Sequence, residues 1–509
     1  MIMRSSFFAF ETARRAIANA QLGLDTVGHN TSNIDTPGYT RQRVDQVSWA
    51  VNGNSKYAVH KGFYPGMGAV ATGISQIRDP FLDARYRAEA GNYGEYIVRQ
   101  DGMNDLQNIF DEVMSDALHE GLGNIVDKLE KALSQPDAQE YASTVRKDVE
   151  KFTSMLNKYS TELGRMRDNQ MDDLEVSVND EVNRILKEIA HLNEQINKVE
   201  VYGNPGNELR DERNMLLDEL AGFVDIQVTE TKKEITQDVA LNYLTVTIKG
   251  TNIELVNKDQ YAEFNFNRNG DLAELSFTDA GGTAHNAAAT DALLEKGGLR
   301  GYLDIINGSG SYTPGAGEND YKGIVYAQKY LDSLAQSFAD AINAVNKQNN
   351  GGTDKPLITN STNNSMAGVT ASTIAISSEW RADPNEIILS NSDTIANPVE
   401  AMRFINAIST EKRSGVLPDL PNTTFQELVA GFTGLIGSEK KQADELLAAS
   451  TKVISTLDDQ RQSISGVSEN EEAINMMTYS NYYNAAVRYM TTLDEALDKI
   501  INGMGIVGR

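Results

Sequence analysis

Apolar residues at the start of the chain recur with the seven-residue period of a helix that packs along one narrow stripe. Two such rows lie between residues 6 and 34, and each member of the second follows one of the first by three residues: Phe10, Ile17, Leu24 and Thr31, then Ala13, Ala20, Val27 and Ile34. Rows with this spacing occupy the a and d positions of a coiled coil. We expect the helix to end at Thr36, because Pro37 disfavours a helical residue before it and Gly38 follows.

The last helix expected in the chain has a similar pattern. Its two rows are Met476, Tyr483, Met490, Leu497 and Met504, with Tyr479, Ala486, Leu493 and Ile500 between them. Further apolar residues, among them Ile474, Met477 and Tyr482, widen its apolar face beyond two rows. The two terminal helices are expected to pair with each other, but such a pair leaves much apolar surface exposed. We therefore expect neighbouring subunits to complete the burial of both helices.

Long helical stretches separate the two ends. Residues 80–201 are predicted to be mostly helical, and the clearest part, residues 171–201, has apolar residues spaced four and three apart: Val178, Val182, Ile185, Ile189, Leu192, Ile196 and Val199. Helical spacing returns at residues 299–306 and 321–346. A final stretch begins at a capping box formed by Thr424 and Glu427 and ends at Gly466.

Short alternating segments indicate strands in the middle of the chain. Residues 243–248 and 253–256 flank a four-residue turn, and Asn269 and Gly270 separate two further strand candidates. Residues 351–421 are polar and rich in turns, with strand candidates at residues 372–377 and 387–389. The predicted fold is therefore mainly α with an inserted β region.

The pattern divides the chain into domains. Residues 1–43 and 465–509 are expected to form a terminal helical coiled-coil domain, and residues 225–297 a small β-rich domain. A helix-rich middle domain is expected to comprise residues 44–224, 298–350 and 422–464. The irregular or β segment 351–421 is assigned to none of them.

Charge and composition exclude several classes of function. The chain has 509 residues, a formal net charge of -26 and no cysteine. Because so acidic a surface repels phosphate, nucleic-acid binding is not expected. Membrane insertion is not expected either, since no run of about 18 apolar residues is present. Glu11, Arg14 and Arg15 interrupt the first apolar patch, so we expect no cleaved signal peptide.

The sequence shows no residue arrangement typical of catalysis or metal binding. None of the five histidines stands at metal-ligand spacing, and no GxSxG or SxxK motif occurs. We therefore expect a non-enzymatic assembly subunit without catalytic residues, cofactor or metal. Two other classes stay open. An extracellular carbohydrate-acting enzyme would need clustered buried carboxylates or a deep apolar pocket in the β region, and a free coiled-coil adhesin would need no export chaperone.

Four segments of the chain resemble bacterial flagellar axial proteins. The first, residues 30–42 (Asn-Thr-Ser-Asn-Ile-Asp-Thr-Pro-Gly-Tyr-Thr-Arg-Gln), directly follows the N-terminal heptad helix. Its Tyr-Thr-Arg-Gln ending resembles the hook-associated protein 1 family of hook–filament junction proteins. The others are residues 207–213 (Asn-Glu-Leu-Arg-Asp-Glu-Arg), residues 331–346, and the C-terminal stretch 465–497 with its Glu471-Glu472-Ala473. Another axial protein, such as a hook protein or a second junction protein, is the nearest alternative.

The resemblance implies a place in the flagellum. Proteins of this kind are exported unfolded through the flagellar type III channel, without cleavage, to the extracellular hook–filament junction. There they form a ring of about eleven like subunits between hook and filament. The implied partners are hook protein, the second junction protein and, before export, a cytoplasmic chaperone that binds the C-terminal region. The terminal helices would line the inner tube and the β-rich domain would face outward.

Fifteen residues are expected to carry this assembly role as a mechanical adaptor. Pro37 and Gly38 are expected to fix the bend between the inner tube and the outer domains, and the apolar seam to bury against neighbours. The full set is Ile17, Leu24, Val27, Asn33, Pro37, Gly38, Tyr39, Arg41, Gln42, Tyr479, Tyr483, Ala486, Met490, Leu493 and Leu497.

Overall fold

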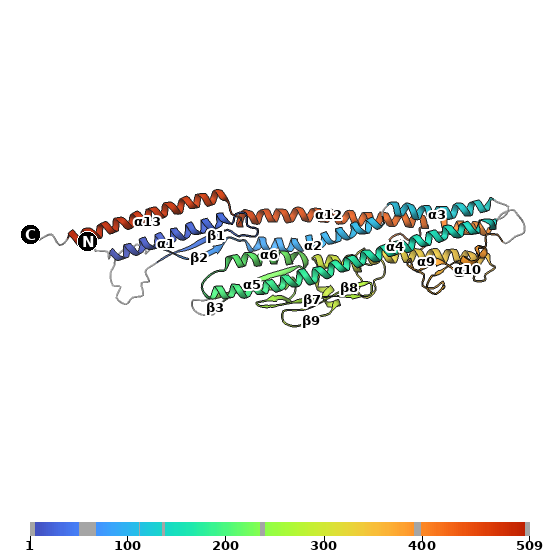
Figure 1. Cartoon of the computed structure of the whole chain (residues 1–509), viewed down its shortest axis with the longest axis horizontal. Coiled ribbons are helices and arrows are strands. Elements are labelled where there is room, and N and C mark those ends of the chain that lie inside the picture. Colours follow the sequence, from blue (N-terminus) through green and yellow to red (C-terminus); the bar gives the residue numbers. More distant parts are fainter. Residues whose placement is uncertain are drawn as a thin grey trace, which may run out of the picture.

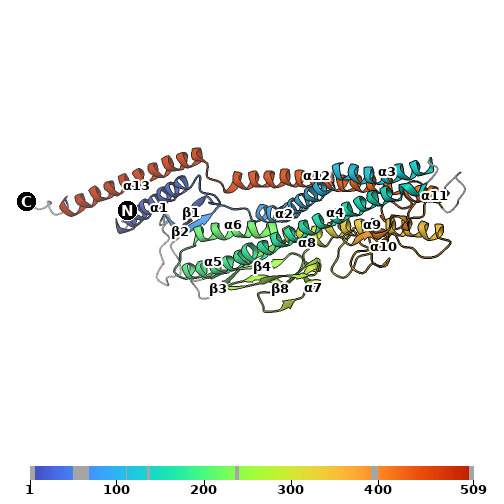
Figure 2. The ribbon, with the colours of Figure 1, turned by 45° about the vertical axis from the view of Figure 1, so that its right-hand side comes forward.

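A long, mainly helical rod is the shape of this protein in the computed structural model, which describes residues 6–49, 68–110, 112–134, 138–234, 240–390 and 399–503. Both ends of the chain lie at one end of the rod (Figure 1). Helices α12 (Phe425–Ser465) and α13 (Glu469–Gly503) follow each other along one side (Figure 2). The prediction of a mainly α fold with inserted strands and paired terminal helices is confirmed.

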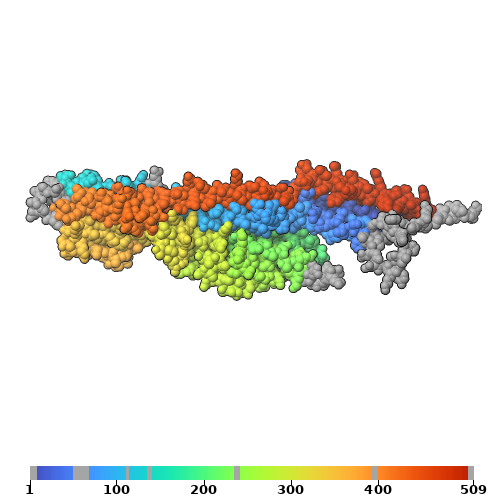
Figure 3. All heavy atoms as spheres, turned by 180° about the vertical axis from the view of Figure 1, so that it is seen from behind, coloured from blue at the N-terminus to red at the C-terminus, as the bar shows by residue number. Residues whose placement is uncertain are grey.

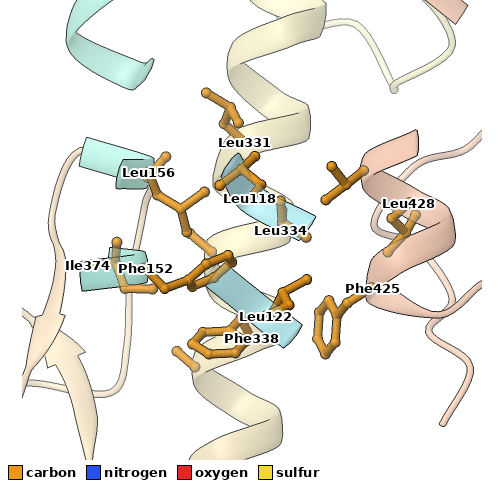
Figure 4. Close-up of a cluster of buried hydrophobic side chains, with 14 of the residues drawn as sticks. Leu118, Leu122, Phe152, Leu156, Leu331, Leu334, Phe338, Ile374, Phe425 and Leu428 are labelled. Atoms are coloured by element: carbon orange, nitrogen blue, oxygen red, sulfur yellow. The ribbon is translucent and has the colours of Figure 1, made fainter. Parts of the chain in front are cut away.

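A first hydrophobic core lies at the end of the rod away from the termini. It is built around the buried faces of four helices: α3 (Glu112–Leu133), α4 (Ala142–Val176), α9 (Ile324–Asn349) and the first half of α12. Figure 4 shows side chains from these helices converging on Phe338. The rings of Tyr330 and Phe432 stack with centroids 3.8 Å apart, and Phe110 at the end of α2 (Pro80–Ile109) packs edge-on against Phe432. The predicted capping box of Thr424 and Glu427 starts α12.

Segment 351–421 is part of this first core. It contributes strands β10 (Ile358–Asn360) and β11 (Ile374–Ile376), short helix α10 (Ser378–Ala382) and α11 (Val399–Ser409). The strand expected at residues 372–377 is present as β11. The prediction of a strand at residues 387–389 was wrong, although Ile387 and Leu389 are buried. The physical reason is that asparagine side chains of α9 take the place of a neighbouring strand, because Ile388 donates to Asn346 and accepts from Asn349.

A second core joins the helices to the strands. The helix predicted at residues 171–201 is helical throughout, but a π turn at Ser177–Val182 separates α4 from α5 (Asn183–Val201). Its apolar residues from Val178 to Ile196 are buried as expected. They pack with α6 (Asn207–Phe223), α8 (Gly298–Asn307) and the sheets.

Small antiparallel sheets cover one side of the helices. The four-stranded sheet has the order β3 (Ile226–Glu234), β4 (Ala240–Ile248), β5 (Glu254–Asn257) and β6 (Gln260–Tyr261). The three-stranded sheet has the order β7 (Glu263–Asn269), β8 (Leu272–Thr278) and β9 (Ala284–His285), and α7 (Ala287–Leu293) follows it. Both predicted hairpins are present, at residues 249–252 and at Asn269–Gly270. In the space-filling view these sheets bulge from the rod opposite α12 (Figure 3).

Candidate assembly site

The terminal helices α1 (Ser6–Ser32) and α13 lie antiparallel and in extensive contact. Small residues face α13 from α1, because Ala13, Ala20 and Val27 are buried and Gly23 lies under the Tyr479 ring. A Cβ atom added at Gly23 would be only 2.5 Å from that ring. The absence of a side chain at Gly23 therefore sets the close approach of the two helices.

The expected seam residues meet in this helix pair, but most are only partly covered. Val27 and Ala486 are buried, with 2% and 7% of their surface exposed. The half-buried ones are Ile17, Leu24, Tyr479, Tyr483, Met490, Leu493 and Leu497. The α1 row of Ala13, Ala20 and Val27 is buried, whereas Ile17 and Leu24 of the other row stay partly exposed. Met476 and Ile500, which were also expected in the seam, are 43% and 49% exposed.

The chain leaves α1 through a tight turn. The amide of Tyr39 donates to the carbonyl of Thr36 at 3.2 Å, with Pro37 and Gly38 between them and a Gly38 φ of 76°. Proline followed by a residue with positive φ is typical of a type II turn. Gly38 also packs against Met215 of α6, where a Cβ would be 2.2 Å from the sulfur. Asn33 is half-buried and its side chain donates to the carbonyl of His29, which closes the end of α1.

Asn30 is the buried centre of the bend. Its Oδ1 accepts from the amide of Gln42 at 2.9 Å and from the hydroxyl of Tyr39 at 2.8 Å. Its Nδ2 donates to the carbonyl of Gln42 at 2.9 Å and to Glu472 of α13 at 3.1 Å. All four hydrogen-bonding positions of the amide are thus filled. The bend is thereby fixed to both terminal helices.

Tyr39 lies over the acidic side of this bend. Its hydroxyl is 2.8 Å from Nδ1 of His29, which therefore carries the proton if Tyr39 donates to Asn30. Burial and the nearby carboxylates Asp211, Glu208 and Glu472 raise the pKa of Tyr39 above its usual range. Tyr39 is therefore a neutral donor at physiological pH.

Arg41 connects the bend to the C-terminal helices. Its Nε donates to Glu472 at 2.8 Å, and its Nη1 also bonds Glu471. The amide of Arg41 donates to the carbonyl of Ser465, the last residue of α12, at 2.8 Å. The side chain of Glu472 is only 2% exposed, so this is a buried ion pair that depends on its partner.

Thr40 and Gln42 connect the bend to α6. The amide and hydroxyl of Thr40 both donate to Asp211, and Gln76 donates to the same carboxylate at 2.7 Å. Gln42 accepts from the side chain of Asn207 at 3.1 Å. Burial raises the pKa of Asp211 to about 6, against the lowering effect of the Thr40 bonds and of Arg78.

Three of the family-like segments therefore converge at one joint. Residues 30–42, 207–213 and 465–497 are far apart in sequence, yet Asn30 donates to Glu472 and Thr40 donates to Asp211. Sequence reasoning missed Asn30, Thr40, Asp211 and Glu472 as site residues. The available signal was that each lies inside one of these segments.

A cavity of about 780 Å³ lies between α2, α6 and β3. Its carboxylates are not free, because Asp83 pairs with Arg78 at 3.0 Å and Glu230 with Arg210 at 3.4 Å. In the described ranges, no group of three or more His, Asp or Glu residues could hold a metal ion. Over the same residues, no helix is long and apolar enough to cross a membrane.

Comparison with known proteins gives consistent matches. The family model "Flagellar hook-associated protein FlgK helical domain" matches residues 103–357, and the model "Flagellar basal body rod FlgEFG protein C-terminal" matches residues 460–503. Flagellar hook-associated protein 1 of Bacillus subtilis (strain 168) is 29% identical over 521 residues, covering 100% of both chains. The Salmonella typhimurium protein of the same name is 21% identical, covering 95% of this chain and 97% of its own. The flagellar hook junction protein FlgK from Burkholderia pseudomallei shares the fold, with a TM-score of 0.57 and 12% identity over 75% of this chain and 100% of that one.

Proposed function

This chain belongs to the FlgK family of flagellar hook-associated proteins, structural proteins of the extracellular hook–filament junction, and we propose that its terminal helix pair is the surface through which its subunits assemble. The family is structural, and the chain is not an enzyme. The proposal concerns which residues make the contacts and with what.

The incomplete burial of the terminal pair carries the proposal. Seam residues such as Ile17, Leu24 and Leu493 are only half-buried within one subunit. Tyr482 and Ile501 are 60% and 67% exposed. Large contiguous apolar surfaces that are exposed usually mark an interaction site. Burial of a Leu or Ile side chain yields about 1.5–3 kcal/mol, so completing it between subunits drives association.

Like subunits in a ring of about eleven are the proposed neighbours, in keeping with closed rotational symmetry. Hook protein on one side and the second junction protein on the other are the proposed axial partners. A cytoplasmic chaperone is proposed to cover the C-terminal region before export without cleavage. The exposed apolar face of α13 supports this last point, because such a face needs cover while the subunit is unassembled.

The joint at residues 30–42 is proposed to set the direction of the terminal pair within the ring. Directional hydrogen bonds from Asn30, Thr40 and Arg41 hold it to α13 and α6. Methionine and other flexible side chains in the seam adapt to partners that differ slightly in spacing. A fixed joint with an adaptable seam is suited to a mechanical adaptor between two lattices.

The substitution Leu493→Asp tests this function. It places a charge in the half-buried seam, so the variant should be exported but should not enter junctions, and cells should lack filaments. Thr491→Asp is the matched control, because Thr491 is exposed on the outer side of the same helix. Fluorescence of the buried Trp380 should be unchanged in both purified variants. Normal filaments on Leu493→Asp cells would show that the seam does not carry assembly.

A further inference from the structure

A groove of about 740 Å³ runs along one side of the terminal pair. Its walls are α1, α13 and the hairpin of β1 (Gln42–Ser48) and β2 (Ala69–Gln76). Apart from Asn19, its helical walls carry alanine and tyrosine: Ala16, Ala20, Tyr479, Tyr482, Ala485 and Ala486. The hairpin wall is mostly polar, with Arg43, Asp45 and Gln46 beside Val44 and Ala69. Alanines leave room for larger side chains, so the groove has the form that accepts a ridge from another helix. Tyr482 at its rim is 60% exposed.

A ridge of larger apolar side chains lies on the same two helices. We define it as the half-buried residues Ile17 and Leu24 of α1 with Tyr483, Val487 and Met490 of α13. Ile17, Leu24, Tyr483 and Met490 belong to the predicted seam and Val487 lies beside it, and all five stay partly exposed. These side chains are larger than the alanines on the helical walls of the groove.

Helix geometry places groove and ridge on opposite sides of the pair. At about 100° per residue, Ile17 and Leu24 lie roughly 100° around α1 from the groove residues. Tyr483 and Val487 lie roughly 150° around α13 from Tyr482 and Ala485. The contact between the helices, through Ala20 and Ala486, lies between the two. A surface and its complement on opposite sides of one subunit cannot meet within that subunit.

We propose that the ridge of one copy of this chain enters the groove of the next copy around the junction. The inference rests on the proposed function and deepens it by naming the two faces that meet. A contact between different faces of identical subunits is heterologous, and it generates a ring when the rotation closes. The occupant is a second copy, because the same two helices carry partly exposed large apolar side chains on the side opposite the groove.

Cysteine cross-linking tests the proposal directly, since the chain contains no cysteine of its own. Leu24→Cys places a thiol on the ridge and Ala485→Cys places one in the groove. Both full-length variants are expressed together in cells that lack the unsubstituted chain. Isolated hook–filament junctions are then treated with a short bismaleimide. Glu495→Cys, exposed on the outer side of α13, is the matched control for either position.

The expected result is a covalent dimer of this chain when both variants are present. The dimer should be lost when either variant is alone or is replaced by Glu495→Cys. Dimers of Leu24→Cys alone would mean that ridge meets ridge and would overturn the proposal. So would the absence of a dimer although the filaments are normal. Filament growth reports separately on the proposed function, because that function fails if cells without any form of this chain still grow filaments.

Discussion

Removing the positive charge of Arg41 should loosen the terminal helix pair without unfolding the rest of the rod. In Arg41→Met the carboxylate of Glu472, whose side chain is 2% exposed, loses its cation. Removing one partner of a buried ion pair costs about 3–5 kcal/mol. Because Asn30 still donates to Glu472 at 3.1 Å, we expect the lower end, about 3 kcal/mol, for the unfolding of the terminal pair. Adding Glu472→Gln should recover about 2 kcal/mol, since no buried charge then remains.

The chain has two tryptophans, so the unfolding of the terminal pair and that of the first core can be measured separately. Trp49 lies beside α1, with the Arg15 guanidinium 4.9 Å from its ring, and Trp380 is fully buried in the first core. Denaturant unfolding followed in Trp380→Phe and Trp49→Phe backgrounds reports the two regions separately. The control is Arg43→Met, because the Arg43–Asp45 pair is exposed. Its loss should change the free energy of unfolding by less than about 1 kcal/mol. An Arg41→Met effect no larger than that of Arg43→Met, or an equal shift at Trp380, would refute the reasoning.

Two further changes test the joint and the first core. The pKa of Asp211 is raised to about 6 from 3.8, so its contribution to stability is full below about pH 4 and is lost as the pH rises through 6. Between pH 4 and 8 the free energy of unfolding reported by Trp49 should fall by at most about 3 kcal/mol relative to the Asp211→Asn variant. An equal pH profile in the two proteins would contradict this. Asn346→Leu should lower the free energy of unfolding reported by Trp380 by about 2–4 kcal/mol. The reason is that the carbonyls of Lys355 and Glu386 and the amide of Ile388 lose their buried partner. Exposed Asn363→Leu is its control, and a shift no larger than in that control would argue against the asparagine contacts.

Local periodicity was enough to predict the helices and hairpins. The four-and-three spacing from Val178 to Ile196 and the capping box at Thr424 depend on residues within one or two turns of each other, so the sequence displays them directly. The β hairpins follow for the same reason, since their turns carry Gly250 and Gly270 at positive φ. Contacts within a few residues leave a pattern in the chain.

Long-range polar contacts leave no such pattern, and they determine the joint at residues 30–42 and the structure of segment 351–421. Asp211 lies 171 residues from Thr40, and Glu472 lies 431 residues from Arg41. Segment 351–421 looked irregular because Asn343, Asn346 and Asn349 of α9 supply its hydrogen bonds from outside the segment. An alternation such as Ile387–Leu389 then buries its side chains without forming a strand. The partner of a buried polar group is a property of the fold, not of its neighbours in sequence.

Two kinds of contact hold the terminal pair. The joint consists of directional hydrogen bonds and ion pairs, such as Asn30 to Glu472 and Thr40 to Asp211, which weaken steeply when angles change. The seam consists of apolar contacts through Tyr483, Met490 and similar side chains, which are not directional and tolerate small displacements. We infer that a change in spacing between neighbouring subunits is absorbed along the seam, while the angle at which α1 and α13 leave the rod is held at residues 30–42. Leu24 and Asn30 are only six residues apart in sequence, but Leu24 makes apolar contacts and Asn30 makes buried hydrogen bonds. This difference in the type of contact makes the division possible.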